Sequence, residues 1–447
     1  MTEKLTVIGS GPGGYKSAIL AAENGLDVTL IEKRDIGGVC TNRGCIPSKA
    51  LLSIAERIDD IESAGRRGIK ATLNGIDFDK IRSIKERAVM TSRKGIEKQL
   101  EENGINIIQG EGELIDKDKV QVDDNIVESD YIIIATGSEP IVLPGLAVDE
   151  RDIFTSNGAL ELKDIPESMV IIGGGYIGIE LAFVYSSFGT DVTIVELMDR
   201  VLPNMDRDLS EETEKILKRK RIKVYTDSKV IDVNGEKPFT IKVEGGVNKD
   251  LEVEKVLCAV GRKPTPPNTE LNEIIGEKGE VVADEKMRTR IESIYAVGDV
   301  NGKSMLAHSA YKQAEIAVSN IVGKETIPFS KYHVPAGVYI HPEIASVGLT
   351  EEEAVERFKK VQVGKFPVSA SGRGYSTGER SGLAKIIAND DKILGVHLIC
   401  PGATDIIMEG TVAMESGIDI NRLSDIIHPH PTYSEILKKA ADKTVHK

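Results

Sequence analysis

Two cysteines, Cys40 and Cys45, stand in the stretch GGVCTNRGCIPSKA, residues 37–50, with four residues between them. A structural disulfide, a metal site and a redox-active pair can each use two cysteines at this range. Zinc sites usually add CxxC pairs or nearby histidines, which this stretch lacks. Cys258 and Cys400 stand far apart in apolar stretches and are expected to be small core residues. A reducing cytosol disfavours a purely structural disulfide, so the pattern favours a loop with a chemical role.

The residues after Cys45 predict a helix that bears on this chemistry. Pro47 suits the first turn of a helix through SKALLSIAERI, so Cys45 would lie at or just before the helix N-terminus. A helix N-terminus lowers the pKa of a thiol and favours the thiolate. Lys49 falls one turn later and would add positive charge near a reduced cofactor. Taken alone, Lys49 is better explained as a solvated helix lysine.

The C-terminal stretch SDIIHPHPTYSEILKK, residues 424–439, supplies a candidate base. His428 and His430 each precede a proline, which holds both histidines out of a helix. A helix is expected to begin near Thr432, where Thr432 and Glu435 form a T-x-x-E capping box. The alternative role of Glu435 is to hydrogen-bond His430, fix its tautomer and stabilise its charged form.

Two stretches that can position a cofactor match each other at a constant offset of 164 residues. The first is LTVIGSGPGGYKSAILAAENGLDVTLIE, residues 5–32, and the second is MVIIGGGYIGIELAFVYSSFGTDVTIVE, residues 169–196. Each predicts a buried strand, a glycine turn, a helix and a second strand ending on a glutamate. The matched positions include Gly9 with Gly173, Gly11 with Gly175, Gly14 with Gly178, and Glu32 with Glu196.

This is the dinucleotide-binding pattern in its full context. The first glycine permits the tight turn, the second lets a pyrophosphate approach the backbone, and the third allows close packing of helix on strand. The helix N-terminus attracts the phosphates, and the glutamate accepts from a ribose hydroxyl. Glycines that merely tighten a turn are the structural alternative for one copy. Two copies in register predict two nucleotides, and therefore electron transfer between cofactors.

Glu196 also bears on which nicotinamide cofactor binds. A carboxylate at this position repels a 2′-phosphate, which prefers arginine. Arg200 is the only nearby cation, and Asp199 sits beside it. The sequence therefore favours NAD over NADP.

Other segments complete these folds. DYIIIATGSEP, residues 130–140, and VLCAVGRKPTP, residues 256–266, predict strands that lead from each fold into a hinge. SIYAVGDV, residues 293–300, predicts a strand that places Asp299 near a ribityl or ribose hydroxyl, with an amphipathic helix over 305–323. From about residue 331 short strands, with helices near 403–416 and 432–443, predict an α+β domain.

Composition limits the partners. The chain of 447 residues carries a formal net charge of −14, so it has no bulk attraction for nucleic acid or anionic lipid. The start, MTEKLTVIGSG, has no signal-peptide pattern, and no apolar run reaches about 18 residues. We therefore expect no membrane span and a cytoplasmic location.

Together, GGVCTNRGCIPSK, the two nucleotide folds, ATGS, YAVGDV, MLAH and HPHPTYSE resemble the flavin disulfide reductases, the class I pyridine nucleotide–disulfide oxidoreductases. The resemblance spans nearly the whole chain. It implies an α/β fold with two Rossmann-like dinucleotide-binding domains and a C-terminal α+β dimerisation domain. The implied domains are an FAD-binding domain (1–140), an NAD-binding domain (141–265), a central domain completing the FAD site (266–330) and a dimer-interface domain (331–447).

The resemblance also implies roles for individual residues. Cys40 and Cys45 would form the redox disulfide, with Cys45 nearer the flavin, and Lys49 would pair with Glu180 near flavin N5. His430, arriving from the other subunit of a homodimer, would be the acid/base, with Glu435 behind it. The implied FAD contacts are Gly9, Gly11, Gly14, Glu32, Lys33, Gly38, Cys40, Lys49, Gly112, Thr136, Gly137, Ser138, Asp299, Met305, Leu306, Ala307 and His308. The implied NAD contacts are Gly173, Gly175, Tyr176, Ile177, Gly178, Glu180, Glu196, Val230 and Gly261. No metal ligand is implied.

The implied reaction oxidises protein-bound dihydrolipoamide to lipoamide with NAD⁺, through Cys40, Cys45 and FAD. The implied partner is the lipoyl domain of a 2-oxoacid dehydrogenase complex or a glycine-cleavage protein. Two alternatives stay open: a reductase of another low-molecular-weight or protein disulfide, and a non-catalytic flavin redox sensor. Val39, Thr41 and Arg43 depart from the residues common in that family, and Arg43 could raise the potential of the pair by stabilising a thiolate.

Overall fold

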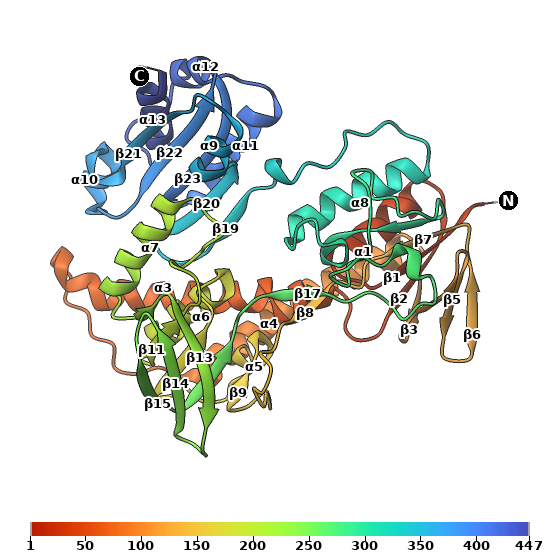
Figure 1. Cartoon of the computed structure of the whole chain (residues 1–447), viewed down its shortest axis with the longest axis horizontal. Coiled ribbons are helices and arrows are strands. Elements are labelled where there is room, and N and C mark those ends of the chain that lie inside the picture. The colour runs from red at the N-terminus through yellow and green to blue at the C-terminus, as the bar shows by residue number, and fades with distance from the viewer. Residues whose placement is uncertain (1, 446–447) are drawn as a thin grey trace. The chain divides into compact units, whose positions relative to one another are not determined.

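The computed structural model describes residues 2–445 and divides by its internal contacts into two compact units (Figure 1). Among these residues, the first unit comprises 2–51, 77–141 and 261–331. The second comprises 52–76, 142–260 and 332–445. Each unit contains one of the two glycine-turn repeats.

The first unit is built on a five-stranded parallel sheet in the order β18-β7-β1-β2-β3. Its inner strands β1, β7 and β2 carry mainly apolar residues that are buried, as expected for a sheet covered on both faces. Val7, Leu30 and Ile133 are fully buried. The strands are β1 (Lys4–Ile8), β2 (Asp27–Glu32), β3 (Asn106–Gln109), β7 (Tyr131–Ile134) and β18 (Ile294–Ala296).

Helices of the first unit are α1 (Pro12–Glu23), α2 (Gly38–Arg43), α4 (Phe78–Glu102) and α8 (Ala307–Ile321), with the start of α3 (Cys45–Ser63). Helices α1 and α8 pack side by side, and the hydroxyls of Tyr15 and Tyr311 lie 2.6 Å apart. The predicted helix over 305–323 is thus confirmed. The 25-residue α4, capped by Asp77, was not predicted from the sequence.

Two smaller sheets complete this unit. β4 (Glu113–Asp116), β5 (Lys119–Val122) and β6 (Asn125–Glu128) form an antiparallel meander. β8 (Ser138–Pro140) pairs antiparallel with β17 (Arg262–Pro264). The two segments predicted to leave the nucleotide folds therefore hydrogen-bond to each other.

The second unit repeats the nucleotide fold with the order β12-β11-β10-β16-β9. Leu5 pairs with Val28 in the first fold, and Met169 pairs with Val192 in the second, at the offset of the sequence repeat. The elements are β9 (Ile153–Phe154), α5 (Ser156–Ala159), β10 (Ser168–Ile172), α6 (Tyr176–Ser187), β11 (Asp191–Val195), α7 (Arg207–Arg219), β12 (Lys223–Tyr225) and β16 (Lys255–Cys258). A meander of β13 (Ser228–Asn234), β14 (Phe239–Gly245) and β15 (Lys249–Val253) is added to it.

The C-terminal segment is α+β, as predicted. Its antiparallel sheet has the order β19-β20-β23-β22-β21. The strands are β19 (Ala336–Val338), β20 (Glu343–Gly348), β21 (Gln362–Pro367), β22 (Leu383–Asn389) and β23 (Lys392–Cys400). The helices are α9 (Glu351–Arg357), α10 (Gly372–Thr377), α11 (Ala403–Glu415), α12 (Ile420–Asp425) and α13 (Glu435–Val445). Helices α11 and α13 pack on this sheet.

Two further expectations can be compared with the structure. Cys258 and Cys400 are buried and belong to no disulfide, which confirms them as core residues. Over residues 2–445, no helix combines the length and apolar character needed to cross a membrane.

Candidate active site

The cysteine pair is a disulfide in the structure. Cys40 and Cys45 are bonded, with their Cα atoms 4.6 Å apart. Cys45 is the first residue of α3, as predicted. Cys40 lies within the short helix α2 rather than in an irregular loop. The pair therefore links the middle of α2 to the first residue of α3.

Helix α2 is attached to the first glycine turn. The Gly37 amide donates to the Ser10 carbonyl at 3.1 Å and contacts the Ser10 hydroxyl at 3.2 Å. Gly38 has a φ of +60°, and a Cβ there would lie 2.6 Å from the Cα of Gly11. Only glycine allows this close approach, which places the disulfide loop beside the predicted FAD phosphate turn.

The first glycine turn fits a dinucleotide. Gly9 has a φ of +97°, and a Cβ on Gly14 would lie 1.8 Å from the Gly9 carbonyl oxygen, so both positions exclude a side chain. Gly11 is the N-cap of α1 and makes no side-chain hydrogen bond. A Cβ built on Gly11 would have no other atom within 4 Å, so the space in front of this residue is open. The buried Thr136 hydroxyl has no hydrogen-bond partner among the described residues. An uncapped helix N-terminus, an open approach and an orphaned hydroxyl suit a bound pyrophosphate cofactor.

The second turn repeats this geometry. Gly173 has a φ of +108°, and a Cβ on Gly178 would lie 2.1 Å from the Gly173 carbonyl oxygen. Gly175 caps α6 without a side-chain bond and again faces open space, with Tyr176 and Ile177 in the first helical turn. This turn fits the second predicted nucleotide, NAD.

The terminal glutamates Glu32 and Glu196 make equivalent hydrogen bonds in the two folds. One oxygen of Glu32 accepts from the Ser10 amide at 2.8 Å, and the other accepts from the Arg34 amide at 2.7 Å. One oxygen of Glu196 accepts from the Gly174 amide at 2.6 Å, and the other from the Met198 amide at 2.8 Å. Each glutamate, 7% exposed, ties the glycine turn to the end of the second strand. This structural role is additional to the predicted ribose contact.

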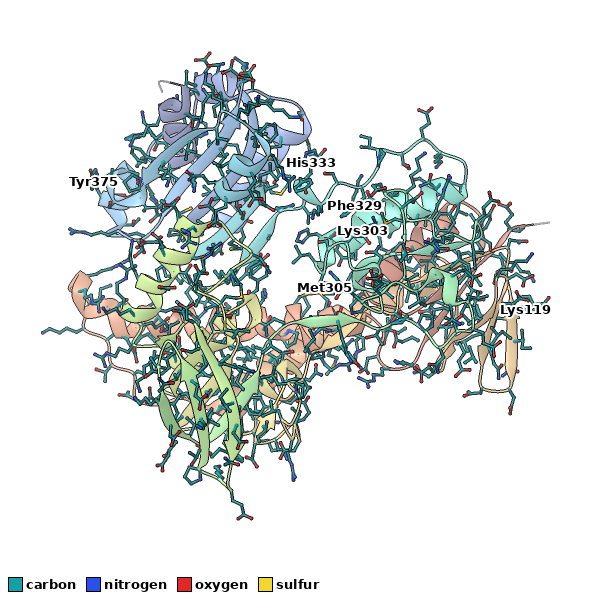
Figure 2. All side chains as sticks on the ribbon, in the orientation of Figure 1. Lys119, Lys303, Met305, Phe329, His333 and Tyr375 are labelled. Atoms are coloured by element: carbon teal, nitrogen blue, oxygen red, sulfur yellow. A yellow bond between two sulfur atoms is a disulfide. The ribbon has the colours of Figure 1, made fainter. Side chains whose placement is uncertain are left out.

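Several other predicted FAD residues gather in the first unit. The Ser138 hydroxyl donates to Asp299 at 2.5 Å and accepts from Arg262 Nε at 2.8 Å. Burial raises the pKa of the Asp299 carboxyl, against the effect of the Ser138 hydrogen bond. Met305 lies on the segment that leads into α8 (Figure 2). The N-cap of α8 is Leu306, whose side chain makes no capping hydrogen bond. The remaining ones are Gly112 beside Ile8, Gly137 with φ +78°, Ala307 and His308 on the first turn of α8, and Lys33, which pairs with Glu111 at 2.8 Å.

The surroundings of Glu196 support the choice of NAD. Arg200 forms an ion pair with Glu352 at 2.7 Å and lies 3.6 Å from Asp199. Its charge is therefore already balanced by carboxylates and is not held ready for a 2′-phosphate. Val230 lies in β13, and Gly261 adopts a φ of +129° after β16.

Lys49 and Glu180 were predicted to pair. Lys49 lies on α3, one turn after Cys45. Glu180 lies on α6, is buried, and accepts from the Tyr339 amide at 3.1 Å. Their mutual contact stays a prediction.

The candidate base is held by its predicted partner. His430 Nδ1 lies 2.9 Å from Glu435 Oε1, and Glu435 Oε2 accepts from the Thr432 amide at 2.9 Å. Burial raises the pKa of Glu435, but the hydrogen bonds from His430 and Thr432 outweigh burial and hold this pKa below its ordinary value. The expected capping box is incomplete, because α13 begins at Glu435 and the Thr432 hydroxyl donates to the Pro429 carbonyl instead.

Sequence reasoning did not identify several residues around these groups. A Cβ on Gly372 would lie 3.1 Å from Cε1 of His430, so α10 packs against the histidine ring. Asp35, Asn42 and Arg93 hold helix α2 through a set of polar contacts. Asp35 precedes the cysteine loop in sequence and Asn42 lies inside it, but Arg93 comes from α4, and no local pattern pointed to it.

A second cluster of titratable groups lies in the second unit. The buried Lys385 ammonium contacts Asp206 at 2.7 Å, Asp208 at 2.5 Å and Glu351 at 2.7 Å. Burial raises the pKa of Asp206, but the His397 and Lys385 charges, with hydrogen bonds from Lys385 and the Glu351 amide, outweigh burial and lower that pKa to about 2. Beside them, burial lowers the pKa of His397. These carboxylates form an ion-pair network with a lysine at its centre.

Comparison with known proteins agrees with this geometry. The model of the pyridine nucleotide-disulphide oxidoreductases matches residues 3–314, and that of their dimerisation domain matches residues 334–441. Dihydrolipoyl dehydrogenase 1, mitochondrial, of Arabidopsis thaliana is 36% identical, covering 99% of this chain and 91% of that protein. Dihydrolipoyl dehydrogenase of Thermus scotoductus is 38% identical, covering 99% and 97%. The solved structure of the HOCl-induced flavoprotein disulfide reductase RclA from Escherichia coli superposes with a TM-score of 0.87 at 28% identity, covering 98% and 99%.

Two dinucleotide folds combined with a cysteine disulfide define an oxidoreductase that uses FAD and NAD(H). The chain belongs to the pyridine nucleotide-disulphide oxidoreductase family and carries that family's dimerisation domain.

Proposed function

We propose that this enzyme catalyses the dihydrolipoyl dehydrogenase reaction, in which protein-bound dihydrolipoamide is oxidised to lipoamide and NAD⁺ is reduced. The observation that carries this proposal is the Cys40–Cys45 disulfide, fixed against the first glycine turn through Gly37 and Gly38. The names of the similar proteins from Arabidopsis and Thermus support the choice of substrate.

The cysteines and histidine divide the chemistry. His430 takes a proton from a dihydrolipoamide thiol, and the resulting thiolate attacks Sγ of Cys40. The Cys40–Cys45 bond breaks, a mixed disulfide forms with Cys40, and Cys45 leaves as a thiolate at the N-terminus of α3. The second substrate thiol then displaces Cys40, which closes the lipoyl ring and leaves both electrons on the cysteine pair. Glu435 holds Nδ1 of His430 and stabilises the imidazolium.

The two glycine turns bind the cofactors. The first turn, with Ser138, Asp299 and the start of α8, holds FAD, and the second turn, with Glu196, holds NAD. The chemistry that FAD supplies when bound is two-electron transfer between the cysteine pair and NAD⁺. Lys49 and Glu180 are proposed to stand near the flavin ring.

We further propose a homodimer in which His430 of the partner subunit serves each cysteine pair. The dimerisation-domain match and the 72% exposure of the His430 side chain support this arrangement. The division into FAD (1–140), NAD (141–265), central (266–330) and interface (331–447) domains is part of the same proposal. The proposed partner is a lipoyl domain of a 2-oxoacid dehydrogenase complex or of glycine cleavage, and the proposed location is the cytoplasm.

Steady-state kinetics of the purified holoenzyme test the proposal. We expect turnover with dihydrolipoamide and NAD⁺ to exceed turnover with oxidised glutathione and NADPH by at least about 100-fold. Cys40→Ser should abolish lipoamide turnover while the NADH-dependent reduction of ferricyanide, which needs no disulfide, persists. The flavin-to-protein ratio of the variant, read from its absorbance, controls for cofactor loss.

Two results would reject the proposal in favour of the alternatives. Turnover confined to glutathione or another small disulfide would make the enzyme a reductase of that substrate. If the Cys40→Ser variant keeps the function of the protein, that function does not depend on disulfide turnover. The protein would then be a flavin redox sensor rather than a disulfide oxidoreductase.

A further inference from the structure

Helix α2, which carries Cys40, ends against a small charge cluster. Asp35, in the segment after β2, accepts from two arginines through its two oxygens. Arg43 Nη1 lies 3.3 Å from Oδ2, and Arg93 Nη1 lies 3.0 Å from Oδ1. Arg43 is the last residue of α2, and Arg93 comes from α4. One carboxylate thus joins the redox helix to the longest helix of the first unit.

Asn42 connects the same cluster to the start of α2. Arg93 Nε donates to Asn42 Oδ1 at 2.9 Å. The Asn42 amide group in turn donates to the Gly38 carbonyl at 2.8 Å and to the Ile36 carbonyl at 3.0 Å. Asn42 is 7% exposed, so these bonds are largely shielded from water. Both ends of α2 are therefore fixed by contacts that lead to Asp35 and Arg93.

The cluster carries a net positive charge. Guanidinium groups stay protonated at any working pH, so Arg43 and Arg93 contribute two charges against the single charge of Asp35. Their side chains are 24% and 34% exposed, so solvent screens the charge only in part. Arg43 follows Cys40 by three residues on one helix, a spacing that places both side chains on neighbouring positions of the same face.

Reduction changes the charge next to this cluster. The disulfide is neutral. Reduction adds two electrons and one proton and breaks the S–S bond. One sulfur becomes a thiol and the other a thiolate, so the site gains one negative charge. A net positive cluster stabilises that reduced form over the oxidised form.

We propose that the Asp35, Arg43 and Arg93 cluster sets the redox potential of the Cys40–Cys45 pair, with Asp35 cancelling one of two activating charges. The three cluster residues are positioning residues, because they act on the cysteine pair through their contacts with α2 and through the electrostatic field of their charges. The inference rests on the proposed redox role of the pair. It keeps the sign that the sequence suggested for Arg43 and adds Asp35 and Arg93, which no sequence motif identified.

Charge-changing variants of the holoenzyme test the sign. The fraction of Cys40–Cys45 disulfide is measured in defined mixtures of reduced and oxidised dithiothreitol, trapped by alkylation and read by peptide mass spectrometry. Asp35→Asn raises the cluster charge and should favour the reduced pair about five-fold. Arg43→Gln lowers it and should favour the disulfide by a similar factor. Each change corresponds to about 20 mV at 29.6 mV per ten-fold.

The double variant separates charge from structure. Asp35→Asn combined with Arg43→Gln restores the native net charge and should return the equilibrium to near the wild-type value. Lys98→Gln, on the same helix as Arg93 but 73% exposed, removes one positive charge outside the cluster and should leave the equilibrium unchanged. The single-variant shifts should also shrink in 0.5 M salt.

Opposite outcomes would overturn the inference. If both single variants shift the equilibrium in the same direction and the double variant is the most altered, the cluster only braces α2. If neither shifts it, the cluster and the pair are not coupled. If dithiothreitol cannot reduce the wild-type pair at all, the redox role in the proposed function fails as well, a result that lipoamide kinetics would reveal independently.

Discussion

His430 is held through one nitrogen and leaves the rest of its ring accessible. Glu435 takes Nδ1 at 2.9 Å and uses its second oxygen for the Thr432 amide, so the carboxylate is fixed at both ends. Gly372 lets α10 lie against the ring without a side chain between them. The histidine therefore has a defined orientation although 72% of its side chain is exposed.

This orientation predicts the effect of removing the base. His430→Gln should lower lipoamide turnover by at least about 100-fold, since a positioned general base contributes 10²–10⁴-fold. Ferricyanide reduction by NADH should be kept, because that activity does not use the histidine. His333→Gln, which replaces a histidine paired with Glu415 in the same C-terminal segment, is the matched control. Equal loss of both activities would assign His430 a structural role instead.

At the residue scale, the sequence predicted partners that are close along the chain. The His430–Glu435 contact spans five residues and followed from residue types and spacing. Arg93 lies 58 positions from Asp35, and Gly372 lies far from His430, so only the folded chain brings them together. Long-range polar contacts of this kind leave no periodic signal in a single sequence.

At the scale of elements, the two kinds of glycine in each turn have different tasks. Gly178 presses against the Gly173 carbonyl and serves the fold, whereas Gly175 faces open space and serves the ligand. Gly178→Ala should destabilise the protein by about 1–3 kcal/mol through overpacking. Gly175→Ala should cost less than about 1 kcal/mol, because its φ of −77° suits alanine. Differential scanning calorimetry compares the two.

For cofactor binding, measured on the protein that stays folded, Gly175→Ala should have a larger effect than Gly178→Ala. Gly175→Ala should weaken NADH binding by about ten-fold or more, since a methyl group would occupy the phosphate approach. Titration of NADH fluorescence measures this, and FAD content should not change. Native NADH affinity in Gly175→Ala would refute the assignment of this turn.

Helix starts show why some elements were harder to predict than others. Thr350 and Glu353 form a complete capping box, and α9 begins at Glu351. Thr432 and Glu435 have the same spacing, but the Thr432 hydroxyl donates to the Pro429 carbonyl instead of capping the helix, and α13 begins three residues after the expected start. The two nucleotide folds were predictable because strand, turn and helix repeat; α2, six residues long, depends on contacts with Ser10 and α4.

At the scale of the whole molecule, a buried ion pair joins distant parts of the second unit. Lys385 and Asp206 are each 1% exposed, and Asp206 comes from the nucleotide-fold segment while Lys385 lies in the C-terminal sheet. Because the folded-state pKa of Asp206 is lowered from 3.8 to about 2, its contribution to stability is present above pH 4 and lost as the pH falls towards 2.

Removal of the lysine should reverse this dependence. Lys385→Met leaves Asp206, Asp208 and Glu351 within 4.8 Å of one another and should cost about 3–5 kcal/mol at pH 7. Protonation of a carboxyl relieves the mutual repulsion of the three groups, so acid should reduce the deficit between pH 7 and pH 4. Thermal midpoints at both pH values measure it. Lys365→Met, which removes a 45% exposed lysine from the same Asp208, should cost less than about 1 kcal/mol. An equal deficit at both pH values would contradict this account.

The proposed dimer makes a prediction about an apolar face. Met408 and Val412 lie one turn apart on α11 and are 47% and 52% exposed. If this face is covered in the homodimer, Val412→Glu should shift the protein to monomer in sedimentation and abolish lipoamide turnover while ferricyanide reduction persists. Val355→Glu, at a 60% exposed valine of α9, is the control. A Val412→Glu dimer with native turnover would place the interface elsewhere.

The double duty of Glu196 has a consequence for engineers who wish to change the coenzyme preference. A common strategy replaces the acidic residue at the end of the second strand with a small or basic one. Here that replacement would also release the amides of Gly174 and Met198, and the phosphate turn would lose its anchor. A usable redesign must therefore introduce a substitute acceptor for those two amides together with the new cationic group.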